Sequence, residues 1–358
     1  MDDQPPLDPM RSAPSDAAAP LREAWYYALP SRRLRRQAVV PKLMLGEPIL
    51  IGRDKAGAPF ALRDLCPHRG MPLSAGHFDG KEIECCYHGW RFDTRGQCTL
   101  IPSLVPGQSF TPGQIHTRCY PAREVQGNIW VFFGEDPAAA PEIPVLDGFY
   151  GCAPHLVESV RFAAAIDHAV IGLMDPAHVP FVHRSWFWRT GRNFVEKEKS
   201  FEPSPHGFTM SRHTTSRNSR AYRLLGAGEM ATDIAFTLPG IRVEHTTIGR
   251  HSLCNMTAIT PIDETTVEIN NCLYWTMPWL TALRPALLPL IATFLGQDRD
   301  VLSRQQEGLR YDPPLMLVGD ADIQARWYAQ IKREYRSARA EGRPFENPVK
   351  ARTLRWRS

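Results

Sequence analysis

The sequence lacks a strong charge imbalance, since its formal net charge is only +4 over 358 residues. It has no stripe of basic residues with interleaved aromatics, which argues against a nucleic-acid-binding protein. The first residues, 1–22, are rich in proline and alanine and contain no apolar core, so they do not form a signal peptide. We expect these residues to form a disordered leader.

Long uninterrupted apolar runs are also absent. The most apolar stretch, residues 272–295, is interrupted by Pro278, Arg284, Pro285 and Pro289. Because a membrane helix needs about 20 consecutive apolar residues, this stretch predicts a buried strand followed by a helix. No membrane span is expected.

The eight cysteines are scattered along the chain and do not predict a secreted disulfide framework. Free thiols instead fit a reducing, cytoplasmic location. Two short motifs nevertheless combine cysteine with histidine: CPHRG at residues 66–70 and CCYHGW at residues 85–90. Together they offer two thiolates and two imidazoles, which can hold one small metal centre.

Two kinds of centre use such a ligand set. A Cys₂His₂ set can bind a tetrahedral zinc ion, and it can also hold a [2Fe–2S] cluster with two histidines on one iron. Zinc fingers usually place both cysteines in one knuckle and both histidines in another. Here each loop contributes one of each, which favours a cluster with Cys66 and Cys85 on one iron and His68 and His88 on the other. Zinc remains the alternative.

The two motifs resemble the Rieske domain of the Rieske non-haem iron oxygenases, in their terminal oxygenase (alpha) subunit. The second loop departs from the family pattern, because Cys86 stands where the family usually has proline. With Cys85 as the ligand, Tyr87, Gly89 and Trp90 occupy the family's positions. A register using Cys86 is the alternative. In the preferred register Cys86 is expected to be a packed free thiol.

The pattern along the chain predicts an α+β protein. Short Val/Leu/Ile runs broken by turn residues over 37–63 indicate strands, and each metal loop is expected at the tip of a hairpin. A Pro/Ala-rich linker covers 135–148, and residues 285–339 are mostly helical after a series of strands. The resemblance implies a small antiparallel β domain followed by a helix-grip (START-like) domain. The predicted divisions are a leader (1–22), a Rieske [2Fe–2S] domain (23–140) and a mononuclear iron catalytic domain (141–358).

A second site is indicated in the segment DHAVIGLMDPAHVPFVH, residues 167–183. Two histidines and a carboxylate with open positions form the ligand set of non-haem Fe(II) oxygenases. Pro180 is expected to break the helix and bring His183 round toward His178. Hydrogen-bonded core or surface residues are the alternative. The family's iron motif is D-x2-H-x4-H, which implies that His178 and His183 bind iron and that Asp175 links the iron to a neighbouring subunit's cluster.

The third iron ligand is expected far downstream. The family places it in a Glu-Asp pair on a late helix, and Gln297-Asp298 resembles that pair. Asp298 is therefore the predicted ligand, with Asp300 as the alternative. On a helix the two residues face about 200° apart, so only one can reach the iron. A solvent-exposed helical charge is the alternative for either.

Other polar and aromatic residues have weaker predictions. His245 and Asn255 are candidates for lining a substrate pocket. Trp275, Trp279 and Leu280 are expected to pack in the core, with the lining of the substrate pocket as the alternative. The only G-x-G sequence, at residues 226–228, lacks the rest of a dinucleotide fingerprint, so no nicotinamide or flavin fold is predicted.

The resemblance implies a terminal oxygenase component that uses O₂ and electrons from a separate ferredoxin or NAD(P)H-dependent reductase. It further implies a homotrimer, in which each cluster serves a neighbour's iron. The expected substrate is a hydrophobic aromatic or polycyclic small molecule, which is hydroxylated or oxidatively dealkylated. The alternatives are a Rieske electron-transfer protein with a non-catalytic ligand-binding domain, and a zinc-stabilised binding protein.

Overall fold

The residues described by the computed structural model are 9–10, 19–108, 110–183, 195–214 and 229–358. The chain forms two compact units. The N-terminal unit is Arg22–Pro154, and the C-terminal unit combines His155–Ser358 with Met1–Leu21. Most of the predicted leader and the G-x-G sequence lie outside the described residues.

The predicted linker belongs structurally to the N-terminal unit. The side-chain amide of Gln126 donates to the carbonyl oxygens of Leu146 (2.9 Å) and Phe149 (2.8 Å) and accepts from the backbone N–H of Leu146 at 2.8 Å. These bonds fasten the Pro/Ala-rich segment to the turn before β12, so the unit continues beyond the expected boundary after residue 140.

The N-terminal unit consists of small antiparallel sheets, with strand orders β11-β12-β2, β10-β5-β4-β3 and β6-β7-β8-β9. The strands are β2 (Ala24–Pro30), β3 (Ala38–Met44), β4 (Glu47–Arg53), β5 (Pro59–Arg63), β6 (His77–Phe78), β7 (Glu82–Glu84), β8 (Arg91–Asp93), β9 (Cys98–Leu100), β10 (Cys119–Tyr120), β11 (Ala122–Val125) and β12 (Asn128–Phe133). Strands β2 and β12 are buried at every position. Their continuous apolar runs follow from having both faces covered.

The sheet β6-β7-β8-β9 presents the second metal loop, residues 85–90, at the tip of the β7–β8 hairpin. The first loop, residues 66–70, is not a hairpin tip as predicted. It joins β5 of one sheet to β6 of another, because the chain is redirected after it by a short turn, Leu73–Ala75. The buried Asp64 carboxylate fixes this turn by accepting from the backbone N–H (2.7 Å) and hydroxyl (2.5 Å) of Ser74.

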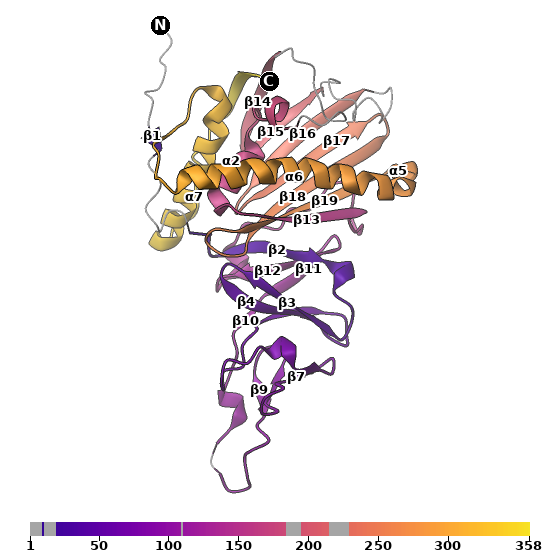
Figure 1. Ribbon diagram of the computed structural model, residues 1–358, viewed down its shortest axis with the longest axis vertical. Coiled ribbons are helices and arrows are strands. Elements are labelled where there is room, and N and C mark those ends of the chain that lie inside the picture. The colour runs from indigo at the N-terminus through magenta and orange to yellow at the C-terminus, as the bar shows by residue number, and fades with distance from the viewer. Residues whose placement is uncertain (1–8, 11–18, 109, 184–194, 215–228) are drawn as a thin grey trace. The chain divides into compact units, whose positions relative to one another are not determined.

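The C-terminal unit is one eight-stranded antiparallel sheet with helices packed against it (Figure 1). Its order is β13-β19-β18-β17-β16-β15-β14-β21. The strands are β13 (Leu156–Phe162), β14 (Glu196–Ser204), β15 (Gly207–Thr214), β16 (Met230–Thr237), β17 (Ile241–Ile248), β18 (His251–Pro261), β19 (Val267–Trp275) and β21 (Arg352–Arg357). The helices are α2 (Ile166–Met174), α3 (Val179–Val182), α5 (Pro278–Ala282), α6 (Arg284–Leu309) and α7 (Ile323–Glu341). A short pair, β1 (Pro9–Met10) with β20 (Leu315–Met316), lies apart from this sheet.

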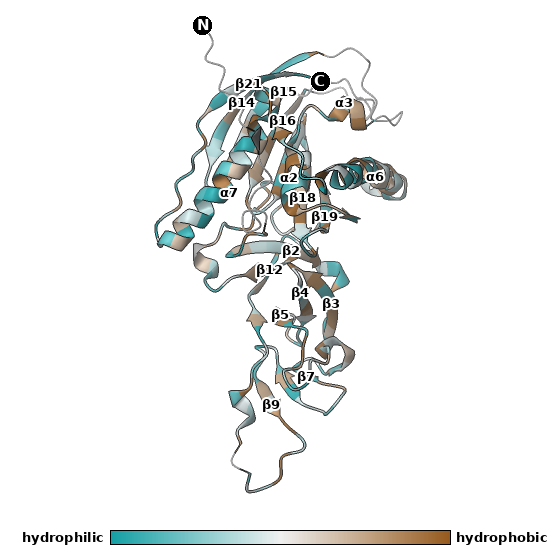
Figure 2. Ribbon diagram, turned by 60° about the vertical axis from the view of Figure 1, so that its left-hand side comes forward, coloured by the Kyte–Doolittle hydropathy of each residue, from teal (hydrophilic) through white to brown (hydrophobic). Residues whose placement is uncertain are grey.

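Helix α7 shows why the helices pack where they do. Figure 2 shows both apolar and polar residues along it, and its buried residues recur at helical spacing, including Ile323, Trp327, Ile331, Tyr335 and Ala338. The Trp327 ring contacts the rings of Phe201 and Phe208 on β14 and β15. Helix α7 therefore packs on the sheet through a stripe of apolar side chains.

Helix α2, which leads to the second candidate site, is held between the sheet and α6. A side chain on Gly240 would meet Val170 of α2 at 3.0 Å, and one on Gly172 would meet Leu302 of α6 at 3.4 Å. Glycine at position 240 therefore lets α2 lie close to the sheet, whereas at position 172 a side chain would make only an ordinary van der Waals contact with α6. The position of α2 limits where Asp175 and His178 can be.

The start of α2 is tied to α7 by a polar contact. The Asp167 carboxylate accepts from the Tyr328 hydroxyl at 2.6 Å and from the Lys332 ammonium at 2.5 Å. The Lys332 side chain is only 6% exposed. A buried ammonium without a partner would be costly, so Asp167 has a structural role that its sequence position did not reveal.

The predicted α+β fold class is confirmed, with small antiparallel sheets followed by a larger sheet-rich unit. The stretch 272–295 forms the end of β19, α5 and the start of α6, as expected. None of the described helices combines the length and apolarity needed to cross a membrane.

Candidate metal centres

The two metal loops of the N-terminal unit have the same backbone design. In the first loop the Gly70 N–H donates to the Cys66 carbonyl at 2.8 Å, and in the second the Gly89 N–H donates to the Cys85 carbonyl at 3.0 Å. Both glycines have φ of +69°, a conformation that glycine adopts at little cost. Matching turns bring the two cysteines into equivalent positions.

The thiols of Cys66 and Cys85 lie together in the core, each 2% exposed. Burial raises the pKa of the Cys66 thiol, and the adjacent Cys85 thiol raises it further. A buried thiol with a raised pKa, such as that of Cys66, has little tendency to ionise unless a cation compensates the charge. This environment suits a pair of cysteine ligands.

The imidazoles are also adjacent. The ring centroids of His68 and His88 are 4.5 Å apart, and the Trp90 ring stacks on His68 at 4.5 Å with an interplanar angle of 3°. The Nδ1 atom of His68 is buried and has no hydrogen-bond partner. A ring nitrogen that has lost water without gaining a donor or acceptor fits a metal ligand.

Cys86 lies next to Cys85 but is exposed to solvent. The expectation that it packs as a buried thiol is therefore wrong. Neighbouring side chains at this hairpin tip point in different directions, so only Cys85 faces the core with Cys66. The geometry favours the Cys85 register.

In the C-terminal unit, the break between α2 and α3 is earlier than predicted. Helix α2 ends at Met174, and Asp175 accepts from the backbone N–H of Ala177 at 2.7 Å. Helix α3 starts only at Val179, with Pro180 inside its first turn. Proline is tolerated there because first-turn N–H groups have no intrahelical partner. The Asp-Pro-Ala turn, and not Pro180, separates the two helices.

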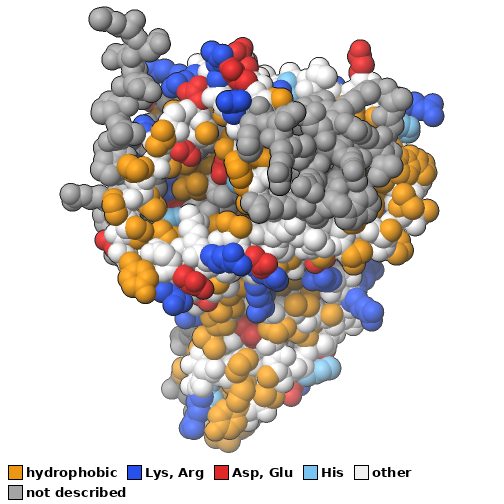
Figure 3. Space-filling view, turned by 45° about the horizontal axis from the view of Figure 1, so that its top comes forward, with side chains coloured by type: hydrophobic (Ala, Val, Ile, Leu, Met, Phe, Trp, Pro, Cys, Tyr) orange, Lys and Arg blue, Asp and Glu red, His pale blue; other side chains and the backbone are white. Residues whose placement is uncertain are grey.

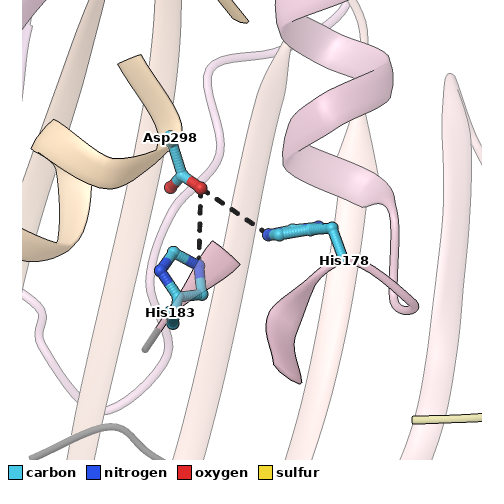
Figure 4. Close-up of side chains that lie close together, drawn as sticks. All are labelled: His178, His183 and Asp298. Atoms are coloured by element: carbon cyan, nitrogen blue, oxygen red, sulfur yellow. Dashed lines mark ion pairs between the residues drawn. The ribbon is translucent and has the colours of Figure 1, made fainter. Parts of the chain in front are cut away.

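This arrangement places His178 and His183 at the two ends of α3, beside Asp298 of α6 (Figure 4). The Asp298 Oδ1 atom is 3.7 Å from His178 Nε2 and 3.4 Å from His183 Nε2. One ligand atom from each of the three residues lies within 4.8 Å of the others. Among the described residues, no other group of three potential ligands converges in this way.

The pKa values of the three residues are shifted in the directions expected for a site that binds a cation. Burial raises the pKa of the Asp298 carboxyl to about 7. Burial lowers the pKa of His183 to about 4, helped by the nearby His178. Burial also lowers the pKa of His178, against the opposing effect of Asp175. Neutral imidazoles and a carboxylate without a cationic partner are the state that a divalent metal stabilises.

The donor atoms fit a mononuclear iron. The Nε2 atom of His183 is buried without a hydrogen-bond partner, and its side chain is 1% exposed. Two imidazoles and one carboxylate leave further coordination positions open, as in the non-haem Fe(II) oxygenases. The alternative acid, Asp300, is 63% exposed and pairs with Arg299, so it faces away from the site.

Comparisons with known proteins identify the domains that contain the two candidate sites. The family model for the "Rieske [2Fe-2S] domain" matches residues 24–121, and that for the "Vanillate O-demethylase oxygenase C-terminal domain" matches residues 167–333. The chain belongs to the Rieske oxygenases. A Rieske cluster is thus the cofactor of the N-terminal unit, instead of zinc, and the family uses a mononuclear iron site as well.

Individual members of the Rieske oxygenases match part of the sequence. Chlorophyllide a oxygenase of Chlamydomonas reinhardtii is 37% identical over 177 residues, which are 47% of this chain and 25% of that protein. The 4beta-methylsterol monooxygenase of Methylococcus capsulatus is 42% identical over 130 residues, 35% of each protein. The chain therefore spans far less than two thirds of these relatives.

Solved Rieske oxygenase structures share the fold over most of the chain. Apo dicamba monooxygenase superposes with a TM-score of 0.68 at 20% identity, covering 90% of this chain and 99% of that one. NdmA of Pseudomonas putida CBB5 with caffeine gives 0.70 at 18% identity, covering 91% and 94%. At such low identity the likeness establishes the fold.

The other residues of this Rieske oxygenase that were proposed to line a substrate pocket or to pack in the core differ in their surroundings. His245 lies 3.9 Å from the Asp233 carboxylate, and the Asn255 side-chain oxygen is buried without a hydrogen-bond partner. Trp275 and Leu280 share a core cluster, as predicted. Trp279 is 45% exposed, so its expected core position is wrong.

Sequence reasoning missed two residues that contact His183. Gln297 lies 3.2 Å from its Nδ1 atom, and the Phe294 ring stacks on it with centroids 3.7 Å apart. Both belong to α6, where Gln297 comes immediately before Asp298 and Phe294 comes one turn before it. The spacing of 294, 297 and 298 on one helical face was the available signal.

Proposed function

We propose that the chain is the terminal oxygenase component of a multicomponent system, which hydroxylates or oxidatively dealkylates a hydrophobic, ring-containing small molecule. The observation that carries this proposal is the convergence of His178, His183 and Asp298 in a chain that also contains a Rieske domain. An electron carrier with a non-catalytic ligand-binding domain would have no use for this triad.

The proposed ligands divide the chemistry between the two units. Cys66, His68, Cys85 and His88 would hold the cluster, whereas His178, His183 and Asp298 would hold the iron. When bound, the His-ligated cluster supplies electrons at a raised potential and the ferrous ion supplies a site for O₂ activation.

Asp175 is proposed to connect the iron site with the incoming electron. Its Oδ2 atom is 3.8 Å from Nδ1 of His178, and the Asp175 side chain is 34% exposed. It can therefore face His178 on one side and a partner surface on the other. In the proposed homotrimer that surface belongs to the neighbouring subunit's cluster loops.

Exposed apolar side chains support an assembly. Trp279, Leu283 and Leu288 of α5, α6 and the segment between them are each more than 40% exposed, and Figure 3 shows apolar side chains gathered at the right-hand edge, where these helices lie. In the N-terminal unit, Tyr87 of the second metal loop and Val105 are 52% and 60% exposed. Grouped apolar surface of this kind is typical of interfaces.

The substrate class and the partners rest on the relatives. Their names refer to dicamba, caffeine, a methylsterol and toluene-4-sulfonate, which are ring compounds. We further propose a separate ferredoxin or NAD(P)H-dependent reductase as electron donor, and a reducing cytoplasmic location for the free thiols and the cluster.

The test combines metal analysis with turnover. Protein prepared without oxygen should contain about three iron atoms for about two acid-labile sulfides, and the reduced protein should show a Rieske EPR signal. With a reductase and a panel of ring-containing substrates, it should consume O₂ and release an oxygenated product. His178→Ala should lose the mononuclear iron but keep the cluster spectrum. A wild-type protein with the cluster and no further iron would be an electron carrier.

A further inference from the structure

Helix α6 contacts His183 on three sides. Phe294, Gln297 and Asp298 occupy positions i, i+3 and i+4 of this helix and thus share one face. The Phe294 ring stacks on the imidazole with an interplanar angle of 15°, the Gln297 amide faces Nδ1 at 3.2 Å, and Asp298 faces Nε2 at 3.4 Å. One helix therefore determines the plane, the proton position and the metal-facing atom of His183.

The proton position follows from the chemistry of the ring. A neutral imidazole carries one N–H, and a metal can bind only the nitrogen with a free lone pair. Since Nε2 faces Asp298 and His178, the proton must be on Nδ1, which then donates to the Gln297 side-chain oxygen. The opposite orientation of the amide would place the proton on Nε2 and block the metal.

The two imidazoles differ in what supports them. His178 Nδ1 has a carboxylate 3.8 Å away, beyond hydrogen-bonding distance. His183 Nδ1 has a neutral amide within that distance. The amide orients His183 without adding a negative charge, so the two residues are held by different means.

We infer that Gln297 is a positioning residue for iron binding, which fixes His183 in the tautomer that offers Nε2 to the metal. This inference rests on the proposed function, because it assumes that His183 binds the iron. Partners that fix a ligand's tautomer typically contribute about 10- to 100-fold in metal affinity.

The test uses the cluster-loaded, full-length protein and measures its dissociation constant for Fe(II) anaerobically, by competition with a chelator. Gln297→Met keeps the length of the side chain but removes the acceptor, and it should weaken binding by about 10- to 100-fold. Gln297→Glu keeps an acceptor and should bind at least as tightly as wild type. Gln305→Met, at an exposed position of the same helix, is the matched control and should have no effect.

A spectroscopic measurement separates positioning from general stability. In oxidised protein loaded with Co(II), Gln297→Glu should change the cobalt EPR signal, because a charged acceptor makes His183 a stronger donor. Gln305→Met should leave the signal unchanged. This readout does not depend on whether Gln297→Met folds well.

The outcomes distinguish the positioning role of Gln297 from the proposed function. Unchanged Fe(II) affinity in Gln297→Met, equal losses in Gln297→Met and Gln297→Glu, or a cobalt signal unaffected by Gln297→Glu would each overturn the positioning role alone. A wild-type protein that binds no Fe(II) beyond the cluster would overturn the proposed function and this inference together.

Discussion

Asp298 is the only acidic member of the candidate iron site, and its partly buried side chain, 25% exposed, lies beside two imidazoles whose pKa values are lowered. Its raised pKa, about 7, means that the proton is held near neutral pH. The same burial that holds the proton makes the carboxylate available to a cation at little further desolvation cost. Metal binding and proton release are thus coupled at this residue.

The affinity for Fe(II) should therefore depend on pH. Below about pH 7 the metal must displace the Asp298 proton, so the affinity should fall by up to about tenfold per pH unit as the pH decreases. Above that pH it should level off. Anaerobic titrations between pH 6 and 8 would measure this, and a flat profile across the range would contradict the assignment of Asp298.

Asp175 should affect electron delivery rather than metal retention. Asp175→Asn keeps an oxygen for the Ala177 N–H but removes the charge near His178. We expect both metals to remain and turnover to fall by about 10- to 100-fold. Stopped-flow absorbance should show slow reoxidation of the reduced cluster with O₂ and substrate present. Loss of iron from this variant would instead make Asp175 a ligand.

Residues near one another in sequence were the easier part of the site to predict. The motif pairs at residues 66–70 and 85–90 lie on tight turns whose geometry is local, and His178 and His183 flank one short helix. Gln297 and Phe294 could not be found in this way, because their contacts with His183 depend on how α6 packs against α3. A pattern along the chain gives helical spacing but no partner.

At the scale of the elements, α2 depends on its contact with α7. Asp167→Ala would leave the Lys332 ammonium buried without its partner, which should destabilise the C-terminal unit by about 3–5 kcal/mol. Replacing both residues, as Asp167→Ala with Lys332→Met, should recover much of that loss. Denaturant unfolding followed by tryptophan fluorescence measures the effect.

The matched control for this ion pair is Asp300→Ala. Asp300 pairs with Arg299, but both side chains are about half exposed or more, so the change should cost less than about 1 kcal/mol. Equal effects of Asp167→Ala and Asp300→Ala would show that the contact between α2 and α7 contributes little.

Strand β21 was not predicted, although its sequence has a strand pattern. Leu354 and Trp356 are buried while Arg355 and Arg357 are exposed, the two-residue period of a half-buried strand. Its pairing with β14 connects residues far apart in the sequence, and only the fold supplies that partner. The helix break before α3 was also predicted in the wrong place. The chain already turns at Asp175, before it reaches Pro180, where the break was expected.

At the scale of the whole molecule, the proposed trimer makes each active site a joint product of two chains. Cys85→Ala should lack the cluster and His178→Ala should lack the mononuclear iron, so each alone should be inactive. Co-expressed in one assembly, they should recover activity, to about a quarter of wild type if subunits mix at random. Oxygen uptake with reductase and substrate measures the recovery.

Mixed assemblies that stay inactive, although both chains are present in them, would mean that electrons pass within a single chain. Cys86→Ala is the control for the cluster variant. It changes the neighbouring exposed thiol and should retain both the cluster spectrum and full activity.

The proposed iron would join His183 at the end of α3 to Asp298 of α6, which lie far apart in the sequence, so it has a mechanical as well as a chemical importance. A single ion bound by both α3 and α6 would cross-link two helices that otherwise meet through a few side chains. Chelating it should loosen α6, raise amide exchange along that helix and expose it to proteases. Protein samples treated with strong chelators would then be degraded faster, independently of the loss of turnover.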